Sequence, residues 1–239
     1  MDSKLFDYTT AFSRNIGWVT PDEQAALRTK RVAIAGLGGV GGSHLLTLAR
    51  LGIGSFTIAD FDTFALENFN RQAGARLSTI GRQKTEVLAK CALDINPELD
   101  LRILKDGINK QNVSGFLDDA DIYVDGLDFF AVPARRLVFA ACHERGIPAV
   151  TAAPLGMGAA LLNFIPGGMT FEEYFRLEGH SEIEQLLRFY LGLSPAVVHK
   201  RSLMDPSTIA LGEHRGPSTA MGCELCAGIV STCLLYTSP

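Results

Sequence analysis

A glycine-rich turn over residues 36–42 constrains the fold of this chain more than any other part of the sequence. It contains the spacing G-x-G-x-x-G, and its relevant glycines are Gly36, Gly38, Gly39 and Gly41. The apolar run 31–35 before it predicts a buried strand, and the leucines after it predict a helix over 41–51. In this context the glycines allow a tight turn and a close approach to a phosphate or ribose, while the helix N-terminus favours negative charge. The arrangement is typical of an adenine-nucleotide site.

The rest of the chain alternates apolar runs with helical patterns. Thr20 as N-cap, Pro21 at the first helical position and Glu23 three residues after the cap predict a helix over 21–29. Strands are expected at 55–59, 99–104, 121–125, 149–153 and 159–165, and helices at 84–93, 112–116, 133–145 and 223–235. This alternation predicts an α/β fold, in which a Rossmann-like, doubly wound and mostly parallel sheet carries helices on both faces.

We assign residues 1–239 to a single nucleotide-binding domain. Residues 1–30 are expected to form an N-terminal arm and helix, and residues 169–210 a helical excursion. A doubly wound sheet often returns to a strand after a helix such as 223–235, so a truncated C-terminus is one interpretation of the chain's end.

Composition narrows the class of protein. Hydrophobic residues make up 47% of the 239 residues and charged residues 20%, which argues against a disordered chain. A net charge of −4 argues against nucleic acid as the default partner. The five cysteines are odd in number and dispersed, which favours a reducing, cytoplasmic location. The uncharged stretch 146–171 is broken by prolines and glycines, so no membrane span is expected.

Residues after the second strand distinguish between kinds of nucleotide. Asp60 ends that strand, where a carboxylate can accept both ribose hydroxyls. An NAD- or FAD-binding oxidoreductase needs no cations beside the glycine turn. Arg71 and Lys84 instead fit a triphosphate, because a guanidinium forks onto phosphate oxygens and an ammonium adds a mobile point charge. Either residue alone would be interpreted as an ordinary surface charge, but together with Asp60 they favour ATP.

A further acidic pair follows the predicted strand 121–125. Asp125 and Asp128 lie where the carboxyl ends of parallel strands gather ligand groups, and a carboxylate there can hold Mg²⁺ that bridges phosphates. We favour Asp128 for the metal because it lies further into the loop, and we interpret Asp125 as a residue that caps the strand end.

These features together resemble the ThiF/MoeB/HesA superfamily of adenylyltransferases, which is related to ubiquitin-activating enzymes. The resemblance covers residues 14–228. It rests on the glycine turn, Asp60-Phe-Asp62, Asn68-x-Asn70-Arg71-Gln72, Gly81-x-x-Lys84 and Asp128. It implies an enzyme that uses ATP and Mg²⁺ to activate a carboxylate as an acyl-adenylate, commonly the C-terminal glycine of a ubiquitin-like or sulfur-carrier protein.

The resemblance also implies roles for single residues. By that similarity Asp60 binds the ribose, Asp128 holds Mg²⁺, and the phosphates contact Asn68, Arg71 and Lys84. Members of the superfamily are commonly dimers, so Arg14 in the segment Arg14-Asn15-Ile16 is expected to reach the partner's site in a homodimer.

Two departures from the superfamily pattern bear on these roles. Phe129 follows Asp128 where the family usually has Asn, so a polar contact is missing or moved. Many members bind zinc through two C-x-x-C pairs, whereas this chain has only Cys223-Glu-Leu-Cys226. His199 and His214 are the remaining candidate ligands, but their spacing matches no known zinc pattern, so zinc is not expected.

Two features of the sequence have more than one interpretation. Cys223 lies near a predicted helix N-terminus and is a possible acyl-accepting thiol, although packing inside a helix start is the favoured interpretation. The aromatic-rich stretches 169–175 and 186–190 form either a groove for a partner's tail or local core.

The leading hypothesis is ATP-dependent adenylation of a carboxylate. Within the same superfamily the alternative is the dehydratase that cyclises threonylcarbamoyladenosine on tRNA, although the net charge does not suggest a tRNA-binding surface. An alternative outside the superfamily is an NAD- or FAD-binding oxidoreductase. A non-catalytic subunit of a paired activating enzyme is a further alternative, against which the presence of Arg71, Lys84 and Asp128 argues.

Overall fold

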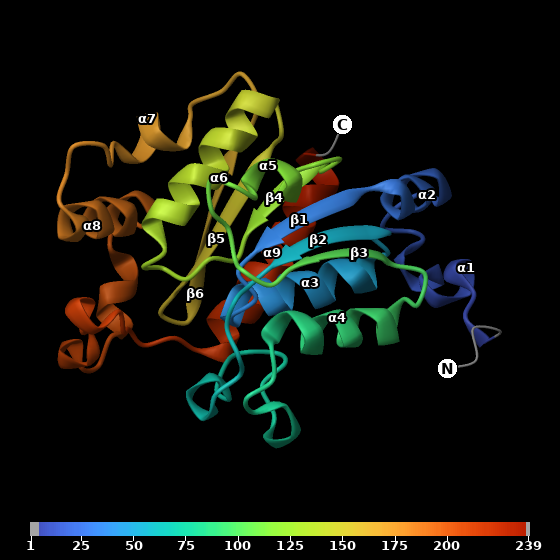
Figure 1. Ribbon diagram of the computed structural model, residues 1–239, viewed down its shortest axis with the longest axis horizontal. Helices are drawn as coiled ribbons and strands as arrows, with labels where there is room; N and C mark the ends of the chain where they lie inside the picture. The colour runs from blue at the N-terminus through green and yellow to red at the C-terminus, as the bar shows by residue number, and fades with distance from the viewer. Residues whose placement is uncertain (1–4, 238–239) are drawn as a thin grey trace.

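The computed structural model describes residues 5–237, and it contains a six-stranded sheet. The strands are β1 (Arg31–Ala35), β2 (Ser55–Ala59), β3 (Asp100–Leu104), β4 (Ile122–Asp125), β5 (Ala149–Leu155) and β6 (Gly158–Phe164). Their order is β3-β2-β1-β4-β5-β6, and all neighbours are parallel except β5 and β6. The predicted α/β fold with a doubly wound, mostly parallel sheet is therefore confirmed (Figure 1).

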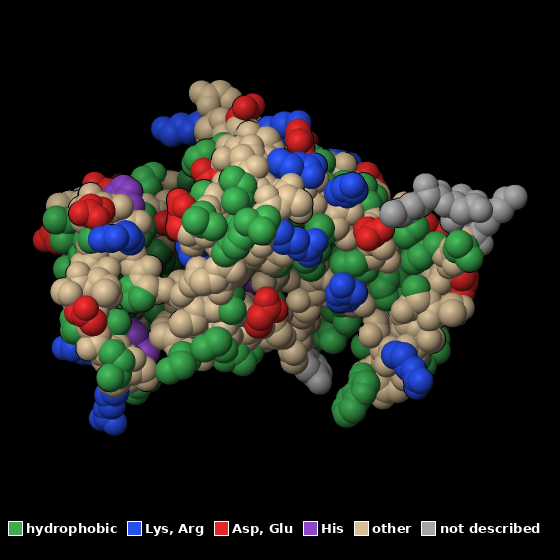
Figure 2. Space-filling model, turned by 90° about the horizontal axis from the view of Figure 1, so that it is seen from below, with side chains coloured by type: hydrophobic (Ala, Val, Ile, Leu, Met, Phe, Trp, Pro, Cys, Tyr) green, Lys and Arg blue, Asp and Glu red, His purple; other side chains and the backbone are tan. Residues whose placement is uncertain are grey.

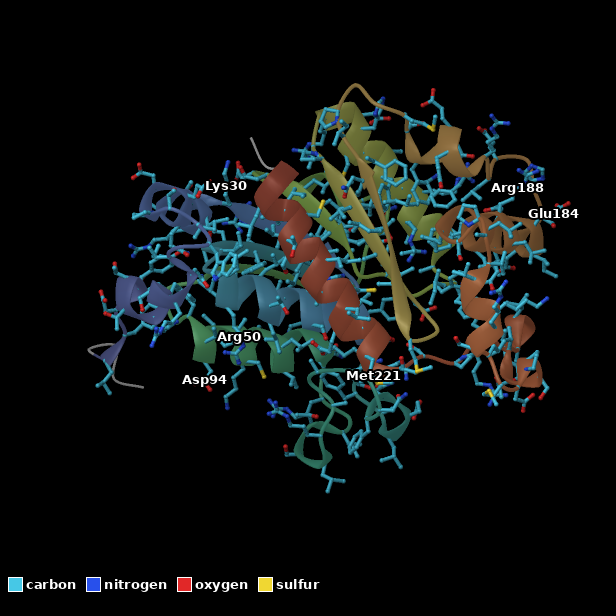
Figure 3. All side chains as sticks on the ribbon, turned by 180° about the vertical axis from the view of Figure 1, so that it is seen from behind. Lys30, Arg50, Asp94, Glu184, Arg188 and Met221 are labelled. Atoms are coloured by element: carbon cyan, nitrogen blue, oxygen red, sulfur yellow. The ribbon has the colours of Figure 1, made fainter. Side chains whose placement is uncertain are left out.

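One face of the sheet carries three long helices. They are α3 (Gly39–Leu51), α4 (Lys84–Ile95) and α9 (Ala220–Thr237), and α9 packs along α3, β5 and β6. Alternate strand residues such as Val32, Ile34, Phe56 and Ile58 are fully buried beneath them, as a period of two requires for a covered face. Figure 3 shows α9 lying across this face, with Met221 at its start.

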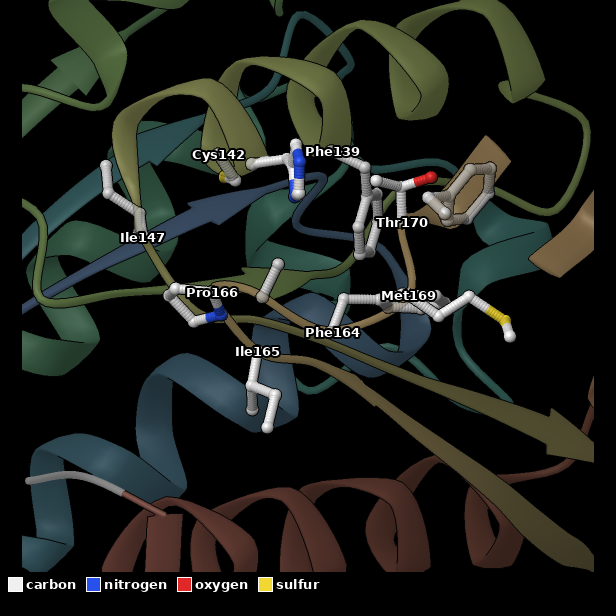
Figure 4. Close-up of a pocket in the computed structure, with 11 residues that line it drawn as sticks. Phe139, Cys142, Ile147, Phe164, Ile165, Pro166, Met169 and Thr170 are labelled. Atoms are coloured by element: carbon white, nitrogen blue, oxygen red, sulfur yellow. The ribbon is translucent and has the colours of Figure 1, made fainter. Parts of the chain in front are cut away.

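The opposite face carries α5 (Val113–Phe116), α6 (Val132–Arg145), α7 (Phe171–Phe175) and α8 (Glu182–Leu193). The rings of Phe139, Phe164 and Phe171 pack against one another there at centroid distances of 4.6–5.6 Å. A cavity of about 10 Å³ beside them has room for about one water molecule (Figure 4). Phe175 and Phe189 are buried in the same cluster, so these parts of the aromatic-rich stretches belong to the core.

The N-terminal segment packs at the far end of α3. It consists of α1 (Tyr8–Ala11), the 3₁₀ turn η2 (Ser13–Asn15) and α2 (Pro21–Thr29), whose predicted capping box between Thr20 and Glu23 is present. Tyr8 donates a 2.6 Å hydrogen bond to the carbonyl of Gly52, and Asn15 donates one to the carbonyl of Leu51. These bonds fix the segment to the C-terminal end of α3.

Two long connections extend from the carboxyl edge of the sheet. The first runs from β2 to α4 and contains η3 (Leu66–Asn68) and η4 (Leu77–Thr79). The second links α8 to α9 through η5 (Val198–Ser202), η6 (Pro206–Thr208) and η7 (Leu211–Glu213). Asn70 in the first donates a hydrogen bond to the carbonyl of Ser218 in the second. Within residues 5–237 we find no helix with the length and hydropathy that crossing a bilayer requires.

Candidate functional site

Three strands end together at one edge of the sheet and form the floor of the candidate site. Gly36 follows β1 with φ +82°, and a Cβ there would collide with the carbonyl of Gly126 after β4. A Cβ on Gly41 would collide with the carbonyl of Gly36. Only glycine permits this approach, which brings the loop after β4 against the turn before α3.

The first amides of α3 are available to a ligand. Gly38 is the N-cap of this helix, and no side chain caps it. The nearest atom to a Cβ built on Gly38 is Nε2 of Gln72, at 3.8 Å. Oε1 of Gln72 is buried without a hydrogen-bond partner in the described structure. An uncapped helix N-terminus and an unpartnered amide oxygen together suit a nucleotide, which offers both anionic oxygens and donors. The sequence motif contained Gln72, but we had not predicted it as a site residue.

Asp60 is held rigidly beside the glycine turn. Its Oδ2 accepts a 2.6 Å hydrogen bond from the amide of Leu37, and its Oδ1 accepts one of 2.7 Å from the amide of Asp62. Burial raises the pKa of this carboxyl, while the two amide bonds and the charge of Lys84 lower it. Each oxygen keeps a further lone pair that can accept from a hydroxyl.

Lys84, which the sequence predicted as a mobile point charge for the phosphates, is buried and paired. It is 5% exposed at the first position of α4, and its Nζ lies 2.9 Å from Oδ2 of Asp62. The residue before it, Gln83, has a buried Oε1 without a partner in the described structure. A buried ammonium in contact with a single, half-exposed carboxylate is placed to exchange that partner for a phosphate.

Arg71 and Asn68 lie in the loop that faces the turn. The Arg71 side chain passes 3.6 Å from a Cβ built on Gly39, and its Nη1 donates to the carbonyl of Glu67 and to Oδ1 of Asn70. Asn68 is buried, and its Oδ1 accepts from the amide of Ala65. Asn68 therefore shapes η3. The aliphatic part of Arg71 lies along the turn, and its charge is near enough to lower the pKa of the Cys223 thiol against the effect of burial.

The two acids after β4 have separate environments. Asp125 is buried and accepts from Arg135, Thr151, Tyr123 and the amide of Leu127. The exposed Asp128 accepts a hydrogen bond from the amide of Phe130. Asp125 thus stabilises the strand end, and Asp128 is the acid that faces solvent.

Phe129, which follows Asp128 in place of the Asn expected from the resemblance, packs on Phe189 with a centroid distance of 5.4 Å. Its side chain therefore joins the core that holds α8 and brings no polar group to the site.

Metal ligands do not gather in the part of the chain that the structure describes. No group of three or more His, Cys, Asp or Glu side chains is close enough to hold an ion. His199 bonds to Tyr190 and Ser194, and His214 stacks on Phe130. The zinc arrangement weighed from the sequence is thus not formed within residues 5–237. Mg²⁺ at Asp128 would have to draw its other ligands from phosphates and water.

Cys223 is a packing residue against the glycine turn. It is 1% exposed in α9, and its Sγ is the nearest atom, at 2.8 Å, to a Cβ built on Gly39. Burial raises the pKa of its thiol and raises that of Cys226 to about 12. Raised values oppose formation of the nucleophilic thiolate, so the structure favours packing over acyl transfer.

Arg14 does not join the other site residues. It is exposed in η2, next to Asn15, which bonds to the C-terminal end of α3. The glycine turn lies at the opposite end of this 13-residue helix, about 20 Å away. Figure 3 shows the two ends, with Arg50 near one and Met221 near the other. Arg14 therefore lies far from the site of its own chain.

Comparison with known proteins identifies the family. The model of the ThiF family matches residues 12–233. The chain belongs to the ThiF family. It is 38% identical over 133 residues to a tRNA threonylcarbamoyladenosine dehydratase of Haemophilus influenzae, covering 55% of this chain and 50% of that protein. It is 32% identical over 143 residues to molybdopterin-synthase adenylyltransferase of Escherichia coli, covering 60% of this chain and 57% of that one.

Solved structures share the fold along nearly the whole chain. The E. coli tRNA N6-threonylcarbamoyladenosine dehydratase TcdA, crystallised with ATP, has a TM-score of 0.68 at 20% identity, covering 96% of this chain and 94% of that one. The chain spans about half the length of the curated relatives it matches.

Proposed function

We propose that this protein uses ATP to activate a carboxylate as an acyl-adenylate. The observation that carries the proposal is the position of Arg71 and the buried Lys84 around an uncapped glycine turn and Asp60. Family membership supports it, since several relatives are adenylyltransferases by name. An NAD- or FAD-dependent oxidoreductase would leave the buried cation of Lys84 without a role.

Each group has a place in binding ATP. Asp60 accepts from the ribose hydroxyls, and the Oε1 of Gln72 accepts another donor of the nucleotide. The amides at the start of α3 face the phosphates, which Arg71 contacts from the loop. Lys84 leaves Asp62 for a phosphate oxygen, so its charge is neutralised both with and without the ligand.

The chemical step needs no base. A carboxylate oxygen attacks the α-phosphorus, a new P–O bond forms, and the bond from the α-phosphorus to the bridging oxygen breaks as pyrophosphate leaves. Negative charge moves to the departing pyrophosphate, where Arg71 and Lys84 stabilise it. Mg²⁺, which Asp128 would hold together with phosphate oxygens, would neutralise part of the same charge.

Two substrates fit this reaction. The carboxylate belongs either to the C-terminus of a ubiquitin-like or sulfur-carrier protein, or to the threonine part of threonylcarbamoyladenosine on tRNA. Relatives of both kinds match the chain. A tRNA substrate calls for a basic surface, whereas the net charge is −4 and Figure 2 shows Lys and Arg interspersed with Asp and Glu on the face in view.

The test is exchange of labelled pyrophosphate into ATP. The protein is mixed with ATP, Mg²⁺ and, in turn, a carrier protein that ends in Gly-Gly or a threonylcarbamoylated tRNA. We expect exchange that depends on one of these carboxylates. Calorimetric titration with ATP and with NADH serves as the control, and tight NADH binding without ATP binding would contradict the proposal.

A further inference from the structure

The connection between β2 and α4 folds into a lobe over residues 61–83, which projects from the carboxyl edge of the sheet (Figure 1). The ring of Phe64 is buried at its centre, and a Cβ built on Gly74 would lie 2.4 Å from it. The amide of Gly81 donates to the carbonyl of Phe64, and Oγ1 of Thr79 donates to the carbonyl of Gly74. The lobe is therefore packed on a small core of its own and presents an ordered outer surface.

Large apolar side chains on this outer surface are exposed to solvent. Leu77 is 81% exposed, and Leu66 and Ile80 are also exposed. Leu77 and Ile80 are three residues apart across the 3₁₀ turn η4, a spacing that puts two side chains on one face. An isolated bridge joins Phe64 to Ile80, so the segment that carries Leu66 adjoins this face. Aliphatic side chains exposed together on an ordered surface mark a contact site for another molecule.

Positive charge accompanies these apolar side chains. Residues 68–85 contain four cations and no Asp or Glu. Two of the cations, Arg71 and Lys84, belong to the candidate nucleotide site. The other two, Arg76 and Arg82, are exposed, and we find no ion pair of either within the described part of the chain. The outer surface of the lobe thus combines exposed aliphatic side chains with guanidinium groups that no neighbouring carboxylate contacts.

This combination of side chains distinguishes between classes of partner. Interfaces with nucleic acid are polar and are built mostly on phosphate contacts, so exposed Leu and Ile side chains have no counterpart there. In a two-fold contact between two lobes, the arginines of one copy would face those of the other and repel them. Interfaces between different proteins have an apolar core and are enriched in Arg, and charge complementarity requires acidic residues on the opposite side. The surface therefore fits an acidic protein with an apolar patch.

We propose that the lobe is the docking surface for a carrier protein whose own contact face is an apolar patch bordered by Asp and Glu. The inference rests on the proposed function, and it selects the protein carboxylate over that of tRNA. Arg71 of the phosphate site and Leu77 of the docking surface are six residues apart, so at most about 20 Å of extended chain separates them. A C-terminal tail of about six extended residues covers that span. The body of the carrier can therefore stay on the lobe while its terminal carboxylate enters the site.

The binding test uses two labelled peptides without ATP, one made of Glu and Leu residues and the other of Lys and Leu. We expect saturable binding of the Glu–Leu peptide alone, measured by fluorescence anisotropy and weakened by added salt. Arg76→Glu should weaken it about 3- to 10-fold, and Leu77→Ser about tenfold, the effect of losing one buried aliphatic side chain. Arg50→Glu on α3 and Ile183→Ser on α8 change exposed residues outside the lobe and should bind as the wild type does.

Two kinds of result would overturn the docking surface. The first is equal affinity of the wild type, Arg76→Glu and Leu77→Ser for the Glu–Leu peptide, or no binding of this peptide by the wild type. The second is a different occupant of the lobe. Binding of unmodified tRNA that Arg76→Glu weakens would assign the lobe to RNA, and a dimer that Leu77→Ser converts to a monomer in light scattering would assign it to self-association.

Pyrophosphate exchange separates this inference from the proposed function. With a carrier protein that ends in Gly-Gly as the carboxylate, Arg76→Glu and Leu77→Ser should raise the KM for the carrier about 3- to 10-fold and leave the KM for ATP unchanged. Exchange that depends on threonylcarbamoylated tRNA alone would overturn the docking surface and leave adenylation standing. Failure of the wild type to bind ATP would contradict the proposed function alone, because the peptide titrations still decide whether the lobe binds an acidic, apolar partner.

Discussion

Arg135 and Asp125 form an ion pair inside the protein, with Nε and Oδ2 2.7 Å apart and both side chains at most 3% exposed. The same guanidinium donates to the carbonyls of Leu127 and Asp128 and lies 4.6 Å above the ring of Phe189. Arg135 therefore connects the end of β4, the loop that carries Asp128 and helix α8.

Removal of Arg135 should destabilise the fold strongly. Arg135→Met leaves Asp125 buried without its cation, so we expect the free energy of unfolding to fall by about 3–5 kcal/mol, measured by urea denaturation. Glu98→Gln breaks the exposed pair with Arg28 and should cost less than about 1 kcal/mol. Equal losses in the two variants would contradict the role assigned to Arg135.

His44 should make stability depend on pH. It is fully buried in α3, neither ring nitrogen has a hydrogen-bond partner in the described structure, and burial lowers its pKa from 6.5 to about 4. The unfolded chain binds this proton at higher pH than the folded one. The contribution of neutral His44 to the free energy of unfolding is therefore complete above pH 6.5. About 3 kcal/mol of it is lost as the pH falls toward 4.

The measurement is urea denaturation of His44→Leu between pH 8 and pH 4. This variant should lose the dependence attributed to His44, whereas the exposed His143→Gln should keep the wild-type profile. If the free energy of unfolding of His44→Leu falls with pH between 6.5 and 4 as steeply as that of the wild type, another group causes the pH dependence.

Lys84 should be required for adenylation and not for folding. Lys84→Ala removes a charge-assisted donor from a reacting phosphate, so we expect pyrophosphate exchange to fall about 10²-fold. Lys90→Ala, on the exposed side of the same helix, should keep wild-type exchange. A circular dichroism melt confirms that both variants are folded. Full exchange by Lys84→Ala would mean that the phosphates bind elsewhere.

Local signals predicted most of the fold. The capping box at Thr20 and Glu23 depends on nearest neighbours, and the helix over 21–29 and the strands over 31–35 and 55–59 have the predicted bounds. Contacts between distant segments could not be predicted in this way. Ten residues separate Asp125 from Arg135, and nothing in that spacing indicates a buried ion pair.

In the candidate site, too, local signals were predictable from the sequence and contacts between distant segments were not. The sequence predicted Asp60 as a site residue because it ends the second strand. It predicted Arg71 and Lys84 because they follow that strand as cations. It could not show that Lys84 is buried against Asp62, or that Cys223 packs on Gly39 from a helix 184 residues further along the chain. A groove between the β5–β6 hairpin and the segment after α8 forms only where these segments meet, so no local pattern indicates it.

The last prediction concerns assembly. We expect a symmetric homodimer in which Arg14 of one chain enters the nucleotide site of the other. Arg14 is exposed at the far end of α3 and cannot reach its own site, and Trp18 beside it is 94% exposed. An exposed Trp and Arg together are typical of an interface, and two-fold dimers are the commonest oligomers of this kind.

Complementation tests this geometry. Arg14→Ala and Lys84→Ala chains should each be inactive alone. Because each mixed dimer contains one intact site, random exchange of subunits should restore about a quarter of the wild-type pyrophosphate exchange. Arg50→Ala mixed with Lys84→Ala controls for non-specific effects of a lost surface arginine, since Arg50 is exposed on α3 and its variant should be active alone. A monomer by light scattering, or no recovery after proven subunit exchange, would show that Arg14 does not act across a dimer.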